Sequence, residues 1–168
     1  MGMDATNMAT LRCRTSNVEG TVGLAAALAQ LVEEGDLLVL TGDLGAGKTA
    51  FTQGFAKALG VAAPVTSPTF TLANRYEGDL VVNHLDVYRL EDTQEARDLA
   101  IPELLEDGVT LIEWGERIAA ALPNDHLAVC ISFGDRDDDR LIALQPTGER
   151  WRSRLSALGD ALEDWTSL

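Results

Sequence analysis

The apolar positions of this 168-residue chain alternate between continuous runs and stretches with helical spacing. The clearest run, Leu37–Leu40 within a strand expected over 36–40, is typical of a strand covered on both faces. The same pattern predicts further strands over 80–87, 109–114, 127–133 and 141–145. It predicts helices over 21–33 and 48–59, short acidic helices over 91–107 broken at Pro102, and a short helix ending near Pro123.

The end of the chain adds a strand pair and an amphipathic helix. The short turn at 134–139 joins the last two strands, so they are expected to pair antiparallel. The final helix places apolar residues at spacings of four, three, four and three: Trp151, Leu155, Leu158, Leu162 and Trp165. Such a seam usually packs on its own domain, and docking on a partner protein is the alternative.

A glycine-rich segment follows the most apolar strand directly. Residues 42–49 read G-D-L-G-A-G-K-T and match the pattern G-x-x-x-x-G-K-[ST] between a strand and a helix. Glycines let successive N–H groups turn toward phosphate oxygens, and the helix N-terminus adds partial positive charge. Lys48 is expected to reach the β- and γ-phosphates, and the Thr49 hydroxyl to ligate magnesium. The expected cofactors are therefore ATP and Mg²⁺, bound by Gly42, Asp43, Leu44, Gly45, Ala46, Gly47, Lys48 and Thr49.

This motif and the alternating elements predict the fold class. We expect an α/β protein of the P-loop NTPase type, a three-layer sandwich with a mostly parallel central sheet and antiparallel C-terminal strands. Residues 1–17 lack periodicity and are expected to form a flexible tail. Residues 18–168 are expected to form a single domain that includes the C-terminal amphipathic helix.

Two acids stand where a P-loop protein holds its metal. Asp86 and Glu113 each follow an apolar strand, so their side chains should emerge at the carboxyl edge of the sheet, where such folds bind ligands. Either could hold magnesium directly or through water, and a solvated acid at a strand end is the alternative for each. Spacing alone does not rank them.

Three further residues each have a functional and a structural interpretation. His84 could act as a base, but a lone histidine in an apolar strand is more often structural. Thr69 lies between the loop and the Asp86 strand, where it could sense magnesium or the γ-phosphate, or only shape a turn. Arg89 could stabilise phosphate charge, although pairing with a neighbouring acid is favoured.

The net charge of the chain restricts the classes of partner that it can bind. The chain has 13 basic and 27 acidic residues, a net charge of −14, which repels a phosphate backbone. Extensive nucleic-acid binding by this chain alone is therefore not expected. Cys13 and Cys130 are too few and too far apart for a metal knuckle or a disulfide framework, which favours a reducing, cytoplasmic setting. No apolar run approaches the roughly 20 residues of a membrane span, so no membrane role is expected.

Four motifs in order resemble the TsaE family, the bacterial ATPases of tRNA threonylcarbamoyladenosine (t6A) synthesis. They are G-D-L-G-A-G-K-T at 42–49, S-P-T-F-T-L at 67–72, H-L-D-V-Y-R-L at 84–90 and L-I-E-W at 111–114. The resemblance runs from about Thr21 to Leu144 and leaves the C-terminal helix unassigned.

The resemblance implies a function and partners. TsaE-like proteins are small α/β ATPases that bind the complex of TsaB and TsaD, and TsaD transfers threonylcarbamoyl to the adenosine beside the anticodon. In such proteins ATP binding and hydrolysis reset that complex between turnovers. For this chain the resemblance implies slow hydrolysis in the absence of the partners, and contact with tRNA only indirectly through the complex.

The resemblance also implies residue roles. The family's magnesium ligands match Thr49 and Glu113, which ranks Glu113 ahead of Asp86 as the ligand. Asp86 matches an aspartate that is important for hydrolysis. Trp114 matches a tryptophan near the nucleotide, and Thr21 a threonine at the base end of the pocket. The implied catalytic residues are Lys48, Asp86 and Glu113.

Two other functions fit a P-loop. A free-standing small-molecule kinase would need an acceptor pocket and a lid, and no arginine-rich lid segment is evident. A GTP-binding switch would be expected to carry the N-K-x-D base-recognition motif, which this chain lacks.

Overall fold

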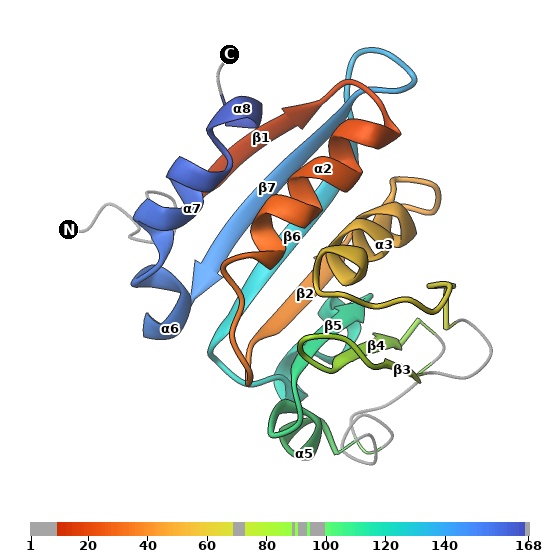
Figure 1. Ribbon diagram of the computed structural model, residues 1–168, viewed down its shortest axis with the longest axis vertical. Helices are drawn as coiled ribbons and strands as arrows, with labels where there is room; N and C mark the ends of the chain where they lie inside the picture. Colours follow the sequence, from red (N-terminus) through yellow and green to blue (C-terminus); the bar gives the residue numbers. More distant parts are fainter. Residues whose placement is uncertain (1–9, 69–72, 89, 91–93, 95–99, 167–168) are drawn as a thin grey trace.

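A seven-stranded sheet, with strand order β1-β7-β6-β2-β5-β4-β3, forms the centre of the computed structural model (Figure 1). The structure describes residues 10–68, 73–88, 90, 94 and 100–166. The strands are β1 (Leu11–Thr15), β2 (Leu37–Thr41), β3 (Ala73–Tyr76), β4 (Val82–Asp86), β5 (Val109–Glu113), β6 (His126–Phe133) and β7 (Arg140–Thr147).

Strand direction divides the sheet into a parallel centre and antiparallel edges. β2 pairs in parallel with both β5 and β6, and β5 pairs in parallel with β4. β3 with β4, β6 with β7, and β7 with β1 are antiparallel. The expected antiparallel pairing of the two C-terminal strands is confirmed.

Helices cover both faces of the sheet. They are α2 (Val18–Ala29), α3 (Lys48–Ala58), α5 (Ile101–Leu105), the 3-10 helix η1 (Gly115–Ala121), α6 (Glu149–Arg152), α7 (Leu155–Ala161) and α8 (Glu163–Thr166). Residues of α2, α3 and the C-terminal helices pack into one apolar core, and residues of α5 and η1 pack into a second. β2 contributes Leu38 and Leu40 to the first core and Leu37 and Val39 to the second, so the strand is covered on both faces as its apolar run predicts. Each helix in the described segments is too short or too polar to cross a lipid bilayer.

The prediction of a flexible tail over residues 1–17 is wrong for the second half of that segment. Leu11–Thr15 forms β1, which pairs with β7, and Asn17 caps α2 by accepting a hydrogen bond from the Gly20 N–H at 2.7 Å. Cys13 and Thr15 are buried on the sheet, while Arg12 is exposed. This strand is short and carries two arginines, as edge strands often do, so its apolar pattern is weak. Residues 1–9 lie outside the described part of the chain.

The prediction of a single C-terminal helix from the apolar spacing is also wrong, because the segment forms three short helices. The backbone leaves helical geometry at Arg154 and at Leu162, which lets α6 contact β7 while α8 contacts β1. The seam nevertheless packs on its own domain, as expected: Trp151, Leu158 and Leu162 are fully buried in the core.

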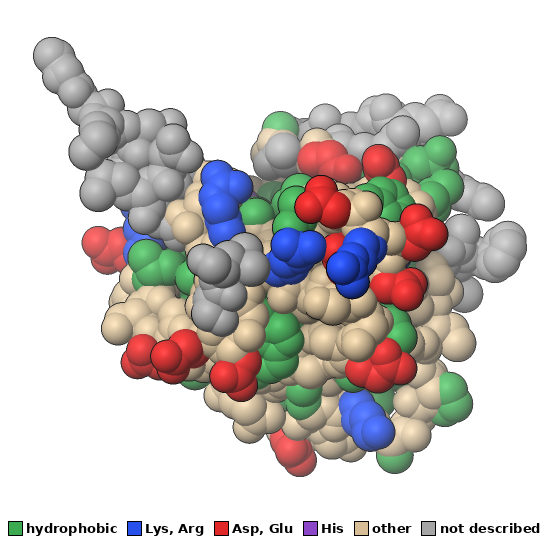
Figure 2. All heavy atoms as spheres, turned by 90° about the horizontal axis from the view of Figure 1, so that it is seen from above, with side chains coloured by type: hydrophobic (Ala, Val, Ile, Leu, Met, Phe, Trp, Pro, Cys, Tyr) green, Lys and Arg blue, Asp and Glu red, His purple; other side chains and the backbone are tan. Residues whose placement is uncertain are grey.

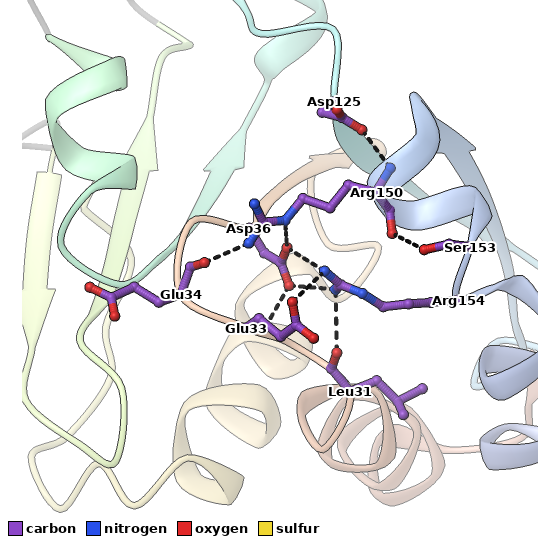
Figure 3. A network of polar contacts seen from close by, with 8 residues as sticks. All are labelled: Leu31, Glu33, Glu34, Asp36, Asp125, Arg150, Ser153 and Arg154. Atoms are coloured by element: carbon purple, nitrogen blue, oxygen red, sulfur yellow. Dashed lines mark hydrogen bonds and ion pairs between the residues drawn. The ribbon is translucent and has the colours of Figure 1, made fainter.

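A buried carboxylate ties these C-terminal helices to the strand that leads into the glycine-rich loop (Figure 3). Asp36 directly precedes β2 and is 0% exposed. Its Oδ1 accepts a hydrogen bond from Arg150 Nε at 2.6 Å, and its Oδ2 accepts one from Arg154 Nη1 at 2.6 Å. The Glu33 N–H also donates to Oδ2 at 2.6 Å, so the buried charge is both paired and hydrogen-bonded.

Replacing Asp36→Asn is expected to lower the free energy of unfolding by about 3 kcal/mol, since it leaves two arginines without their anion. Chemical denaturation measures this loss. Glu34→Gln is the matched control, because Glu34 accepts a hydrogen bond from Arg150 through its backbone carbonyl and its side chain is exposed. A variant D36N as stable as the wild type would show that the network contributes little.

Candidate functional site

The glycine-rich loop connects β2 to α3 and depends on glycine for its shape. Gly42, Gly45 and Gly47 have φ values of 148°, 83° and 115°, in the region that side chains rarely adopt. A Cβ on Gly42 would lie 2.4 Å from the Ile131 carbonyl oxygen of β6, whereas a Cβ on Gly45 or Gly47 would meet no atom within 4 Å. The loop is therefore pressed against the sheet at one end and bordered by open space at the other.

The loop and the start of α3 form a cradle suited to an anion. The turn is closed by a hydrogen bond from the Ala46 N–H to the Asp43 carbonyl at 3.0 Å. The N–H groups in the first turn of a helix have no intrahelical acceptor, and the helix dipole adds positive charge at this end. Since α3 begins at Lys48, these donors lie at the loop.

Lys48 is buried beside the loop. Its Nζ donates to the carbonyls of Gly42 and, at 3.3 Å, of Asp43. It also lies 4.2 Å from the centroid of the Trp114 ring, within cation–π range. Trp114 has a φ of 66°, and its N–H donates to the Leu40 carbonyl of β2 at 3.1 Å. The structure therefore brings together two residues expected near the nucleotide.

Two carboxylates lie on neighbouring strands and line one cavity with residues of the loop. Asp86 ends β4 and Glu113 ends β5, and the two are direct partners in the parallel register. Both are buried. Asp86 Oδ1 accepts a hydrogen bond from the Tyr88 N–H at 2.9 Å, and Glu113 Oε2 lies 2.8 Å from His84 Nε2. Neighbouring buried carboxylates repel one another, so the arrangement favours a bound cation.

These groups line one cavity of about 410 Å³. Its walls are Leu44, Gly45, Gly47, Lys48, Thr49, Ser67, Asp86, Tyr88, Glu113 and Trp114. A threonine hydroxyl and two carboxylates are hard oxygen donors, and Mg²⁺ in phosphate-binding sites commonly takes one or two carboxylates together with phosphate oxygens. The residues present therefore fit a magnesium ion bound with a phosphate ligand.

A second, smaller cavity of about 150 Å³ also borders the loop. Its walls are Asn17, Val18, Thr21, Gly45, Ala46, Gly47, Ala50, Asp138 and Arg140. Thr21 is buried, and its hydroxyl lies 2.9 Å from that of Thr15 in β1. Gly45 and Gly47 of the loop thus border two cavities, one that contains Asp86 and Glu113 and one that contains Thr21.

Arg140, at the start of β7, is a site residue that the sequence analysis missed. Its Nε donates to the Ala46 carbonyl at 2.8 Å and its Nη2 to the Gly45 carbonyl at 3.4 Å, so it braces the loop from outside. The Arg14 guanidinium, by a hydrogen bond of 2.7 Å, holds the pKa of the preceding Asp139 carboxyl below its usual range. The face of the molecule drawn in Figure 2 carries basic and acidic side chains interspersed with one another. No local motif marks Arg140, because it stands far from the loop in the sequence.

The remaining candidates are placed as follows. Thr69 and Arg89 lie outside the described residues. Ser67 lines the larger cavity. His84 is 0% exposed and contacts Glu113, so the structure places it behind the carboxylate and not in the open cavity.

Comparison with known proteins gives the family. The family model described as threonylcarbamoyl adenosine biosynthesis protein TsaE matches residues 15–142. The chain belongs to the TsaE family. A Bacillus subtilis protein named tRNA threonylcarbamoyladenosine biosynthesis protein TsaE is 44% identical over 146 residues, 86% of this chain and 90% of that protein. The protein of the same name from Treponema pallidum is 43% identical over 67% of this chain and 84% of its own length.

A solved structure is also similar to this chain. The crystal structure of YdiB from Bacillus subtilis superposes with a TM-score of 0.74 and 36% sequence identity, covering 92% of this chain and 95% of that one. Similarity of this extent spans both the glycine-rich loop and the strands that end in Asp86 and Glu113.

Replacing Gly42→Ala is expected to reduce the free energy of unfolding by about 3 kcal/mol, since the added methyl group combines an unfavourable φ with a collision against β6. Gly45→Ala is the matched control: it carries the same methyl group at a positive φ but meets open space, and should lose about 1 kcal/mol. Denaturant midpoints measure both. Equal losses would mean that strain alone, and not close packing on β6, requires Gly42.

Proposed function

We propose that this protein is a magnesium-dependent P-loop ATPase that supports t6A modification of tRNA together with TsaB and TsaD. The observation that carries the proposal is that Lys48 of the loop, Asp86 and Glu113 line one cavity, in a chain of the TsaE family. The fold is proposed to be a three-layer P-loop NTPase sandwich, with ATP crossing the loop from one cavity to the other.

The chain's own groups account for binding of the phosphates. Backbone N–H groups of residues 45–49 surround the β-phosphate, and Lys48 turns from the Gly42 and Asp43 carbonyls toward the β- and γ-phosphates. Thr49 and Glu113 would hold Mg²⁺, which would neutralise charge that develops on the phosphate oxygens. The cavity containing Thr21 takes the base end of the nucleotide, and Arg140 keeps the loop in place between the two ends.

Asp86 acts on the attacking water. Its Oδ1 is engaged by the Tyr88 N–H, which fixes the carboxylate and leaves Oδ2 for a water aligned with the γ-phosphate. Trp114 and Tyr88 have ring centroids 4.9 Å apart and form one wall of the cavity, which limits access of bulk water. Thr69 is proposed to sense the γ-phosphate.

The partner assignment rests on the family and on charge. Relatives that share over 40% identity are named for tRNA t6A biosynthesis. A chain of net charge −14 is poorly suited to hold tRNA, so contact with tRNA is proposed to be indirect, through TsaB and TsaD in the cytoplasm.

ATP turnover is expected to be slow for the protein alone and to rise at least tenfold with TsaB and TsaD. Lys48→Ala should abolish nucleotide binding by calorimetry, while Lys57→Ala, an exposed lysine at the other end of α3, should leave it unchanged. Phosphorylation of a metabolite, with no change in rate when TsaB and TsaD are added, would favour a kinase. A strong preference for GTP over ATP would favour a switch protein.

Substitutions of the two carboxylates are expected to impair ATP turnover in different ways. Glu113→Gln should raise the magnesium concentration needed for turnover at least tenfold, because it removes the charge on a metal ligand. Asp86→Asn should keep nucleotide affinity within about threefold and lower the turnover number about a hundredfold, since it acts on the water. Steady-state kinetics over a range of magnesium concentrations separates the two. Normal magnesium dependence in E113Q would return Asp86 to the ligand role.

A further inference from the structure

His84 is a buried polar residue to which the proposed mechanism gives no task. It lies in β4, is 0% exposed, and does not line either cavity beside the loop. Its Nε2 is 2.8 Å from Glu113 Oε2, and the Glu113 side chain is itself only 4% exposed. A hydrogen bond between two such buried groups is strong and strictly oriented, because water does not compete with it.

Sheet register explains why these two side chains meet. His84 is the direct partner of Leu111 in β5, and Glu113 follows two residues later. Side chains two residues apart on a strand share one face, so His84 and Glu113 are diagonal neighbours on the same face of the sheet. That diagonal spacing is within reach of long side chains, and the parallel pairing fixes it.

The other ring nitrogen determines which atom carries the proton. Within the described part of the chain, His84 Nδ1 is buried and has no hydrogen-bond partner. Burying an N–H donor without an acceptor is costly, so the proton belongs on Nε2, where Glu113 Oε2 accepts it. The Nε2–H group thus holds one carboxylate oxygen of Glu113 and leaves the other oxygen free for a cation.

We propose that His84 is a positioning residue that orients Glu113 for magnesium. The hydrogen bond fixes Oε2 and directs the other oxygen, Oε1, to the cavity that contains Thr49 and Lys48. Groups of this kind, one step behind a metal ligand, commonly change metal affinity by ten- to a hundredfold. The inference rests on the proposed function, since it assumes that Glu113 binds magnesium with the nucleotide.

Two substitutions separate positioning from simple filling of space. His84→Met keeps similar length and apolar packing but loses the N–H donor, and His84→Gln offers an amide N–H near the position of Nε2. His126→Gln is the matched control, because that histidine contacts the Pro123 carbonyl at the start of β6, at the opposite edge of the sheet from the loop. Thermal melting checks that each variant is folded.

ADP binding by calorimetry, with and without magnesium, is the readout. We expect H84M to need about tenfold more magnesium for half of the magnesium-dependent gain in ADP affinity, while its affinity without magnesium stays within about twofold of wild type. H84Q should recover to within about threefold, and H126Q should match the wild type.

Several outcomes overturn the proposal. They are a magnesium dependence in H84M equal to wild type, an H84M defect that is as large without magnesium, or an H84Q defect as large as that of H84M. If H84M does not fold, His84→Asn takes its place, because its shorter amide does not reach Glu113. If the ADP affinity of the wild-type protein were the same with and without magnesium, the result would instead overturn the proposed function, and this inference with it.

Discussion

Parallel pairing of β4, β5 and β2 is the constraint on which the site depends. Because parallel strands end at one edge, the pairing sets Asp86 opposite Glu113 and Glu113 opposite Leu40, just before the loop begins at Gly42. Residues far apart in the chain thereby face one cavity. The apolar cores on both faces of the sheet keep this register, since a shift of one residue would turn Glu113 away from the loop and into the opposite core.

The loop is held from several directions before any ligand enters. Close contact of Gly42 with β6 fixes its first residue, and Arg140 holds the carbonyls of Gly45 and Ala46. Asp36, bound by arginines of the C-terminal helices, anchors the strand that leads into it. Such bracing lets the backbone N–H groups keep the orientation that a phosphate requires, which lowers the cost of ordering the loop on binding.

Much of the fold followed from local patterns, and the errors have physical causes. The apolar run of β2 and the glycines of the loop are strong signals, because they reflect burial on both faces and positive φ values. β1 was missed because an edge strand with two arginines has little apolar contrast. β3, a short exposed strand, was missed for the same reason. The apolar spacing of the C-terminal segment was predicted correctly, but the chain bends twice, so that α6 contacts β7 while α8 contacts β1.

The sequence by itself determined the phosphate loop, the two acids at strand ends and the resemblance to TsaE, because each of these depends on neighbouring residues or on ordered motifs. Only the tertiary structure decided which groups act on one another. Arg140 reaches Ala46 across 94 positions of the chain, Arg14 reaches Asp139 across 125, and His84 reaches Glu113 by a diagonal of the sheet. These contacts depend on strand order and register, which no local pattern encodes.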